Sequence, residues 1–215
     1  MKARSLFKTF VFAFVIMAIL GFVYPTVVSL ITENTLPWQS EGSPVIINGT
    51  VYGSEYLAEA FNSSLFFQPR PSATGYNLSI SGSSSLSPND PGYLNVTEQY
   101  LKQFLEENPG INVSQVPYSM VAPSDSGLDP NIPVLGAFDQ VPRIANSICD
   151  LAAENNITMG LNATEVFLNH TITDHEAQNF PIFGSYYVNT VTLNFIIIKL
   201  LMEKGILPAN FLASS

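Results

Sequence analysis

The chain has 215 residues, of which 47% are hydrophobic and only 12% are charged, and its formal net charge is −9. This acidic, charge-poor composition excludes a disordered chain and a nucleic-acid-binding protein, because phosphates need a basic surface. The only cysteine, Cys149, excludes an internal disulfide framework and a multi-cysteine zinc site.

The first predicted element is a transmembrane helix over residues 9–32. These are uncharged and lie between Lys8 and Glu33. As a helix they extend about 36 Å, which exceeds the hydrocarbon core of about 30 Å. A cleaved signal peptide is the alternative, but its apolar stretch would be shorter and would end in a small-x-small site. Pro25 is expected to kink the helix near its outer end, since proline lacks a backbone N–H.

The charges predict the orientation of this helix. Three basic residues, Lys2, Arg4 and Lys8, precede it, whereas residues 33–215 carry five basic and 17 acidic residues, a net charge of −12. The positive-inside rule then places residues 1–8 in the cytoplasm and the main domain outside a single-pass cell-membrane anchor. Residues 33–44 are predicted to be a linker, and residues 45–215 an extracytoplasmic α/β domain.

Within that domain, Asn48-Gly49 between two β-prone runs indicates a hairpin. Residues 68–92 are rich in Pro, Ser, Gly and Asn and are predicted to form a long loop. A helix is expected from Leu94 to the stop at Pro109-Gly110, and another over the apolar positions 144–152, with Pro142 in its first turn.

Farther along, Asn162 and Glu165 resemble a capping box that opens a third helix. Residues 188–193 are β-rich, and 195–204 are predicted to be a closing helix. Residues 177–198 carry no charge, so a second membrane span is the competing interpretation. Their many polar side chains are costly at membrane depth and favour a buried strand and helix instead.

Eight Asn-x-Ser/Thr sequons are a further sign of an external location. Each is a possible N-glycosylation site if the domain lies outside the membrane. A surface rich in Ser, Thr and Asn produces sequons by composition alone, which is the competing explanation. The sequons begin at Asn48, Asn62, Asn77, Asn95, Asn112, Asn156, Asn162 and Asn169.

No catalytic or metal-binding motif is found, and no catalytic residue is predicted. Phosphate-binding glycine loops and the Gly-x-Ser-x-Gly motif are absent. His170 and His175 are five residues apart, do not share one helical face, and are predicted to lie in a solvated loop. Cys149 is interpreted as a small core residue rather than as a nucleophile.

Two runs of residues have a composition that restricts their conformation. Arg70 lies between two prolines, which limit where its guanidinium points. Residues 124–130 include Gly127, which can adopt positive φ, and Ser126 and Asp129, which can bond local backbone. One interpretation is that Arg70 and Arg143 neutralise acids such as Asp129. The other is that this rigid pair of loops docks a partner subunit.

These motifs resemble the C subunit of the Kdp-type potassium-transporting ATPase, in order and along nearly the whole chain. The matching stretches are Gly21-Phe22-Val23-Tyr24-Pro25, Gly53-Ser54, Arg70-Pro71-Ser72-Ala73, Ser81-Gly82-Ser83-Ser84, Ser124-x-Ser126-Gly127-Leu128-Asp129-Pro130, Gln140-Val141-x-Arg143-Ile144-Ala145, and Val188-Asn189 with Leu193-Asn194. The candidate site residues are therefore Gly21, Tyr24, Pro25, Arg70, Pro71, Ser72, Ser124, Ser126, Gly127, Leu128, Asp129, Gln140, Arg143, Asn189 and Asn194.

The resemblance implies a non-pumping accessory subunit of a high-affinity, ATP-driven K⁺ importer. Its implied partners are a channel-like K⁺-translocating subunit, a P-type ATP-hydrolysing subunit, a very small single-span subunit and the lipid bilayer. The family is described as a catalytic chaperone that raises the ATP affinity of the hydrolysing subunit, so ATP and K⁺ are handled by the complex. The alternative function is a glycosylated cell-envelope interaction protein with no transport role.

Overall fold

The computed structural model describes residues 2–47, 49–180 and 184–208. The chain divides into two compact units, Met1–Tyr52 and Gly53–Ser215. The sequence predicted a domain that starts at residue 45, and the second unit starts at Gly53.

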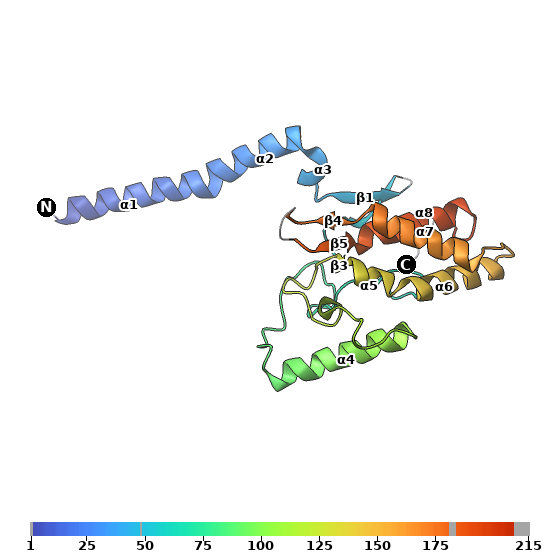
Figure 1. Cartoon of the computed structure of the whole chain (residues 1–215). Helices are drawn as coiled ribbons and strands as arrows, with labels where there is room; N and C mark the ends of the chain where they lie inside the picture. The colour runs from blue at the N-terminus through green and yellow to red at the C-terminus, as the bar shows by residue number, and fades with distance from the viewer. Residues whose placement is uncertain (1, 48, 181–183, 209–215) are drawn as a thin grey trace. The chain divides into compact units, whose positions relative to one another are not determined.

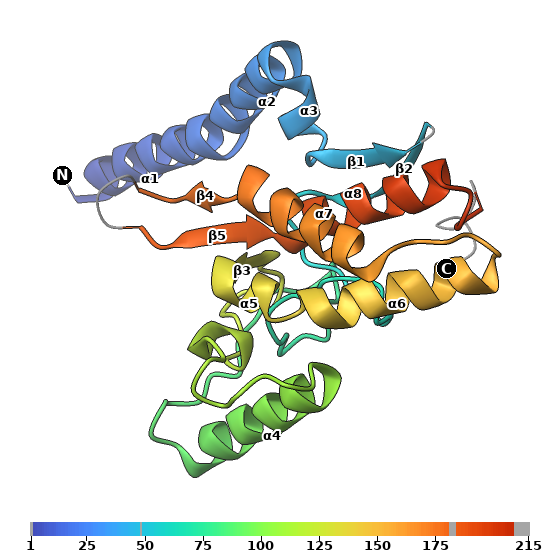
Figure 2. The same cartoon turned by 45° about the vertical axis from the view of Figure 1, so that its right-hand side comes forward.

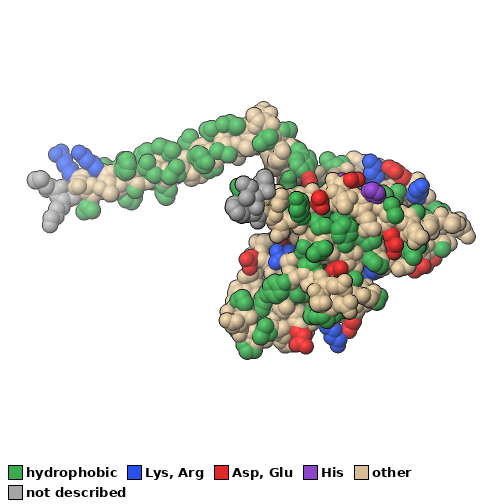
Figure 3. All heavy atoms as spheres, viewed as in Figure 1, with side chains coloured by type: hydrophobic (Ala, Val, Ile, Leu, Met, Phe, Trp, Pro, Cys, Tyr) green, Lys and Arg blue, Asp and Glu red, His purple; other side chains and the backbone are tan. Residues whose placement is uncertain are grey.

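The first unit begins with a long apolar helix. The α-helix α1 (Lys2–Ala18), a π turn (Ile19–Val23) and α2 (Tyr24–Thr35) form one continuous rod (Figure 1). Its segment Arg4–Thr35 is long and apolar enough to cross a membrane, with a mean hydropathy of 2.4 and none of the window buried. Figure 3 shows hydrophobic side chains along the rod and basic side chains at its N-terminal end. The predicted helix over 9–32 is thus present and is longer at both ends.

Pro25 is accommodated by the π turn that precedes it. Proline has no N–H to donate to the preceding turn, so a regular α-helical ladder is interrupted there. The Tyr24 N–H instead bonds the carbonyl of Ile19, five residues back. The Thr26 hydroxyl donates to the carbonyl of Phe22 at 2.7 Å. The wider turn keeps the rod continuous through the proline.

After the rod, the first unit continues with a short helix and with a hairpin whose second strand ends two residues past Tyr52. Helix α3 (Pro37–Ser40) lies in the segment 33–44 that was expected to be a linker, and α2 ends in the same segment. Strands β1 (Pro44–Ile47) and β2 (Thr50–Ser54) pair as the predicted hairpin. Gly49 has a φ of 82°, as its turn position requires, and Asn48 lies outside the described residues.

The second unit combines helices with a small antiparallel sheet, which agrees with the predicted mixture of helices and strands. Its sheet has the order β3 (Asn131–Pro133), β5 (Tyr186–Asn189) and β4 (Ala177–Gln178). In the register, Ile132 is opposite Val188 and Ala177 is opposite Tyr187. The unit also contains the helices α5 (Val134–Phe138), α6 (Val141–Glu154), α7 (Leu161–Asp174) and α8 (Thr190–Glu203). Of these, α6 and α7 lie side by side (Figure 2).

The core is formed by the apolar faces of α6, α7 and α8 with the central strand. Its fully buried side chains include Ile144, Ile148, Leu168, Ile172, Val188, Ile197, Ile198 and Leu201. Because α8 is buried in this core, the interpretation of 177–198 as a strand and helix is confirmed. The described residues contain one candidate span, and it is the N-terminal rod.

Helix α4 (Pro91–Glu107) covers the predicted helix and begins three residues before Leu94. Asp90 is its N-cap, and its Oδ1 accepts the Gly92 N–H at 2.6 Å. Pro91 suits the first position, where no N–H is needed. Of the apolar face, Phe104 is buried.

Three local predictions were wrong. The N-cap of α7 is Gly160, so Asn162 lies within the first turn and forms no capping box. Strand β5 ends at Asn189, whose side-chain oxygen accepts the Thr192 N–H at 3.1 Å and opens α8 within the run predicted to be β. His170 lies on α7 rather than in a loop, and His175 ends that helix.

Candidate functional site

The segment between β2 and α4 has an irregular backbone that is nevertheless partly buried. The described residues 55–90 contain no helix or strand, which extends the loop predicted over 68–92. Phe66 and Phe67 are 4% and 0% exposed. Buried backbone groups need hydrogen-bond partners, and without a strand neighbour they must be supplied by side chains.

Two buried amide side chains supply these partners for adjacent residues. Asn194 of α8 accepts the Phe67 N–H at 2.7 Å and donates to the Phe67 carbonyl at 2.9 Å. Gln140, the N-cap of α6, accepts the Gln68 N–H at 2.7 Å and donates to the Gln68 carbonyl at 3.2 Å. Both amides are 0% exposed. Each one replaces the strand that would otherwise pair with the segment.

Arg143 of α6 binds the residues that directly precede Phe67 and Gln68. Its guanidinium donates to the carbonyls of Ser64 at 2.7 Å and Phe66 at 3.2 Å, and to Gln140 Oε1 at 2.8 Å. Its Nε donates to Asn108 Oδ1 at 3.0 Å. Burial lowers the pKa of Arg143, and the nearby charge of Glu107 opposes that effect. The hydrogen bonds of Arg143 within the described residues go to carbonyl and amide oxygens, and Glu107 is the acid whose charge acts on it without an ion pair between them.

Arg70 does form the expected ion pair. Its Nη1 lies 3.0 Å from Asp129 Oδ2, and its Nε donates to the carbonyl of Ser119 at 3.3 Å. Asp129 Oδ1 also accepts the Asn131 N–H at 3.0 Å, which fixes the start of β3. Both side chains are about a quarter exposed, so the pair contributes about 0–1 kcal/mol. Its main effect is to place the Arg70 loop against the turn before β3.

The two motif loops also interlock through Ser72 and Gly127. Ser72 Oγ donates to the Gly127 carbonyl at 2.6 Å, and the Ser124 N–H bonds the Pro71 carbonyl at 3.2 Å. Gly127 has a φ of 72°, and an added Cβ would lie 2.5 Å from Thr74 Oγ1. The predicted turn is completed by Ser126, whose Oγ accepts the N–H of the buried Leu128 at 3.1 Å. Glycine is therefore required at 127 by both conformation and space.

Asn189 holds the start of the irregular segment. Its Nδ2 donates to the Glu55 carbonyl at 2.7 Å while its oxygen caps α8. The structure thus brings together the family-motif residues of the second unit around residues 55–76. Gly21, Tyr24 and Pro25 belong to the first unit, in and directly after the π turn.

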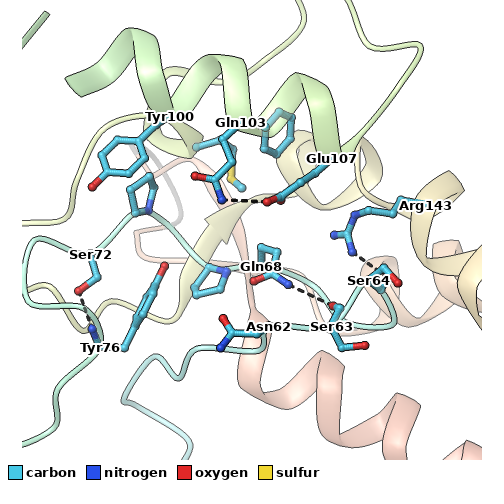
Figure 4. A pocket seen from close by; sticks show the side chains of 14 residues that line it. Asn62, Ser63, Ser64, Gln68, Ser72, Tyr76, Tyr100, Gln103, Glu107 and Arg143 are labelled. Atoms are coloured by element: carbon cyan, nitrogen blue, oxygen red, sulfur yellow. Dashed lines mark hydrogen bonds between the residues drawn. The ribbon is translucent and has the colours of Figure 1, made fainter. Parts of the chain in front are cut away.

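Residues 64–68, which Asn194, Gln140 and Arg143 fasten to the helices, are called the held segment. A cavity of about 550 Å³ lies between α4 and the held segment. Figure 4 shows Tyr100, Gln103 and Glu107 on α4 facing Tyr76, Gln68 and Arg143. Burial, with the charges of Tyr100 and Glu107, raises the pKa of Tyr76 to about 12, so its hydroxyl stays protonated and donates to the Arg70 carbonyl at 2.9 Å. The lining is mixed: it includes hydroxyls, amides, prolines, the apolar Phe104 and Met120, and the opposite charges of Glu107 and Arg143.

The residues considered for catalysis do not converge. No group of three or more His, Cys, Asp or Glu side chains in the described parts of the chain can hold a metal ion. His175 Nδ1 lies 2.9 Å from the Thr171 carbonyl, within its own helix. Cys149 is half-buried, with Sγ 3.7 Å from Thr164 Oγ1. Sequence reasoning missed Asn108 and Tyr76, which form part of the site but lie outside the matched motifs.

Asp139, which follows α5 and precedes Gln140, is a half-buried acid, and it predicts a pH effect. Its Oδ2 is buried and has no hydrogen-bond partner among the described residues, and desolvation raises the pKa of the carboxyl above its ordinary value of 3.8. A raised carboxyl pKa means that stability is fully present below pH 3.8 and declines as the pH rises through the higher, folded-state value.

We therefore expect Asp139→Asn to raise the thermal midpoint of the full chain near pH 7 and to leave it unchanged near pH 3. Circular dichroism of the detergent-solubilised protein measures both midpoints. Asp150→Asn, at an exposed position of α6, is the matched control and is expected to change neither midpoint. A lower midpoint for Asp139→Asn near neutral pH would contradict the assignment.

Comparison with known proteins assigns this scaffold to a family. The family model described as "K+-transporting ATPase, c chain" (KdpC) matches residues 6–198. The potassium-transporting ATPase KdpC subunit of Thermoplasma acidophilum is 53% identical over 202 residues, which cover 94% of this chain and 96% of that protein. The chain belongs to the KdpC family.

More distant KdpC subunits match over similar lengths. The subunit of Caldanaerobacter subterraneus is 32% identical over 192 residues, with 89% of this chain and 93% of that protein covered. The subunit of Methanosphaerula palustris is 34% identical over 177 residues, with 82% and 87% covered. Membership makes the chain a subunit of the Kdp K⁺-transporting ATPase, with an accessory role in K⁺ import and no catalysis of its own. Its partners are the other Kdp subunits.

Proposed function

We propose that the chain anchors through its N-terminal helix beside the K⁺-translocating subunit and holds its second unit as a rigid docking body on the outer side of the membrane. The observation that carries this proposal is the rod Arg4–Thr35, whose most apolar window is wholly exposed in the isolated chain. Such a surface is stable only against lipid or neighbouring helices. The three basic residues at one end of the rod support a cytoplasmic N-terminus.

Within the membrane, the π turn is the proposed contact with the channel-like subunit. An added Cβ at Gly21 would meet nothing within 4 Å, so this side of the rod is open to a partner. A glycine there allows the backbone of a neighbouring helix to approach closely. The Thr26 hydroxyl donates to the Phe22 carbonyl, so this hydroxyl needs no partner from a neighbouring helix.

Outside the membrane, the interlocked loops around Arg70 and Gly127 are the proposed docking surface. Their side-chain ties fix one conformation before binding, which reduces the entropy lost on association. We propose that ATP and K⁺ are bound by the partner subunits. A unit outside the membrane affects the ATP affinity of the hydrolysing subunit only by allosteric coupling through the packed helices, without touching the nucleotide.

Capture of the tagged full chain from a mild-detergent extract tests this function. We expect the channel-like and P-type subunits, and a very small single-span subunit, to be retained, and K⁺-stimulated ATPase activity to be lost from membranes that lack the chain. Gly21→Leu is expected to weaken retention of the channel-like subunit, whereas Leu20→Ile, a change of shape only, is the control. Retention of envelope proteins without ATPase subunits would favour the glycosylated interaction protein instead.

A protease test reports the orientation separately. Protease added to intact cells is expected to digest residues 53–215, and protease added to inside-out vesicles is expected to spare them. The opposite pattern would overturn the external placement, whatever the capture experiment retains.

A further inference from the structure

The sequons are the one sequence feature that the accessory role does not explain, and the structure divides them into two classes. Seven of the eight begin at asparagines in the described residues, and all seven of these asparagines are exposed. Exposure of the asparagine therefore does not distinguish one sequon from another. The third residue does, because an oligosaccharyl transferase recognises its hydroxyl together with the acceptor amide.

Four sequons lie in irregular segments and present both groups to solvent. Their third residues, all exposed, are Ser64, Ser79, Ser114 and Thr158. At Asn77 the side-chain oxygen accepts the Ser79 N–H at 2.9 Å, which brings the hydroxyl residue next to the acceptor amide. Asn156 has a φ of 60°, in the turn that follows α6.

The other three sequons lie on helices and bury the hydroxyl. Thr97 Oγ1 on α4 is buried. On α7, Thr164 and Thr171 are 2% and 5% exposed, and their hydroxyls donate to the carbonyls of Gly160 at 3.1 Å and Phe167 at 2.8 Å. A transferase reaches these hydroxyls only after the helix unwinds, and α7 contributes to the core.

We propose that the folded chain is N-glycosylated at Asn62, Asn77, Asn112 and Asn156 and spared at Asn95, Asn162 and Asn169. The proposal rests on the external placement under the proposed function. The donor is a lipid-linked oligosaccharide. Its bond between sugar C1 and the phosphate oxygen breaks, a bond from C1 to the asparagine Nδ2 forms, the lipid phosphate leaves, and the amide proton passes to a base of the transferase.

One of the four acceptors adjoins the cavity. Asn62 lines it together with Ser63 and Ser64, on the side opposite α4 (Figure 4). A glycan at this position extends over the opening and limits access from solvent. Modification at Asn62 would therefore protect the cavity, and with it the held segment, from proteases.

Mass spectrometry of glycopeptides from the chain in its native membranes tests the assignment. We expect sugar at the four loop sequons and bare asparagine at the three helical sequons. Ser79→Ala is expected to abolish modification of Asn77 alone, and Ser79→Thr to restore it. Sugar at the helical sequons in proportions equal to the loop sequons, or at none of the seven, would overturn the proposal.

A second experiment tests which sequons a transferase can modify, independently of the side of the membrane on which the domain lies. Purified full-length chain is incubated with an oligosaccharyl transferase and its lipid-linked donor, once folded and once after unfolding in urea followed by dilution. We expect the loop sequons to react in both samples and the helical sequons only after unfolding. Helical sequons that react equally in the folded sample would refute the hydroxyl argument.

The two experiments also separate this inference from the proposed function. Loop modification in the purified system without sugar in native membranes would refute the external glycosylation. The quadruple variant with glutamine at the four loop asparagines is expected to retain the ATPase subunits on capture. Loss of those subunits from a chain that carries the glycans would count against the docking function alone.

Discussion

Asn194→Leu is expected to lower the free energy of unfolding of the second unit by about 2–5 kcal/mol. The substitution preserves volume in the core, but it leaves both the N–H and the carbonyl of the buried Phe67 without their partner. Each buried, unsatisfied backbone group costs about 1–3 kcal/mol, and among the described residues no strand pairs with the segment to replace the lost bonds.

Urea unfolding of the full chain in detergent, followed by far-ultraviolet circular dichroism, measures the effect. The apolar rod remains helical in the micelle, so the transition reports residues 53–215. Asn146→Leu is the matched control, because Asn146 is exposed and its amide donates to the Pro142 carbonyl of its own helix. A loss for Asn194→Leu no larger than that of the control would show that water replaces the amide.

Arg143→Met is expected to cost about 3–5 kcal/mol of stability and to weaken capture of the partner subunits. Methionine fills the space of the aliphatic stem, but the carbonyls of Ser64 and Phe66 and the oxygen of Asn108 lose charge-assisted hydrogen bonds. Because the segment ahead of Arg70 is then released, the proposed docking loops around Arg70 and Gly127 lose their fixed conformation.

Arg143→Lys separates charge from geometry in this prediction. Lysine keeps the positive charge but lacks the planar fork that reaches several oxygens at once, so we expect a loss close to that of methionine. Full stability of the lysine variant would mean that the charge alone holds the segment. Stability that falls while partner capture is unchanged would separate the hydrogen bonding of Arg143 from docking.

Patterns of short range were predicted well from the sequence. The apolar rod was predicted from a long run of apolar residues. Helices α4 and α6 were predicted from apolar residues spaced along one helical face, with proline or glycine marking an end. The turn at Gly127 and the bonds of Ser126 and Asp129 were also predicted, because they connect residues only two or three positions apart.

Predictions failed where two local signals compete or where partners are distant. Asn189 follows β-prone residues, yet its side chain caps a helix, and the cap decides the conformation of residues 190–193. The bonds from Asn194 to Phe67 span 127 positions, and those from Gln140 to Gln68 span 72. No periodicity marks such a pair, so the family motifs identified these amides without indicating what they bind.

Phe67 and Gln68 are neighbours in the chain, but they are fastened to different helices, α8 and α6. The peptide unit between these two residues therefore connects the two helices through hydrogen bonds. A sliding movement of either helix would have to break one pair of amide bonds or drag the Arg70 loop with it. A load applied at the proposed docking loops would thus be shared by two core helices at once, which makes this unit suited to transmit force rather than to absorb it.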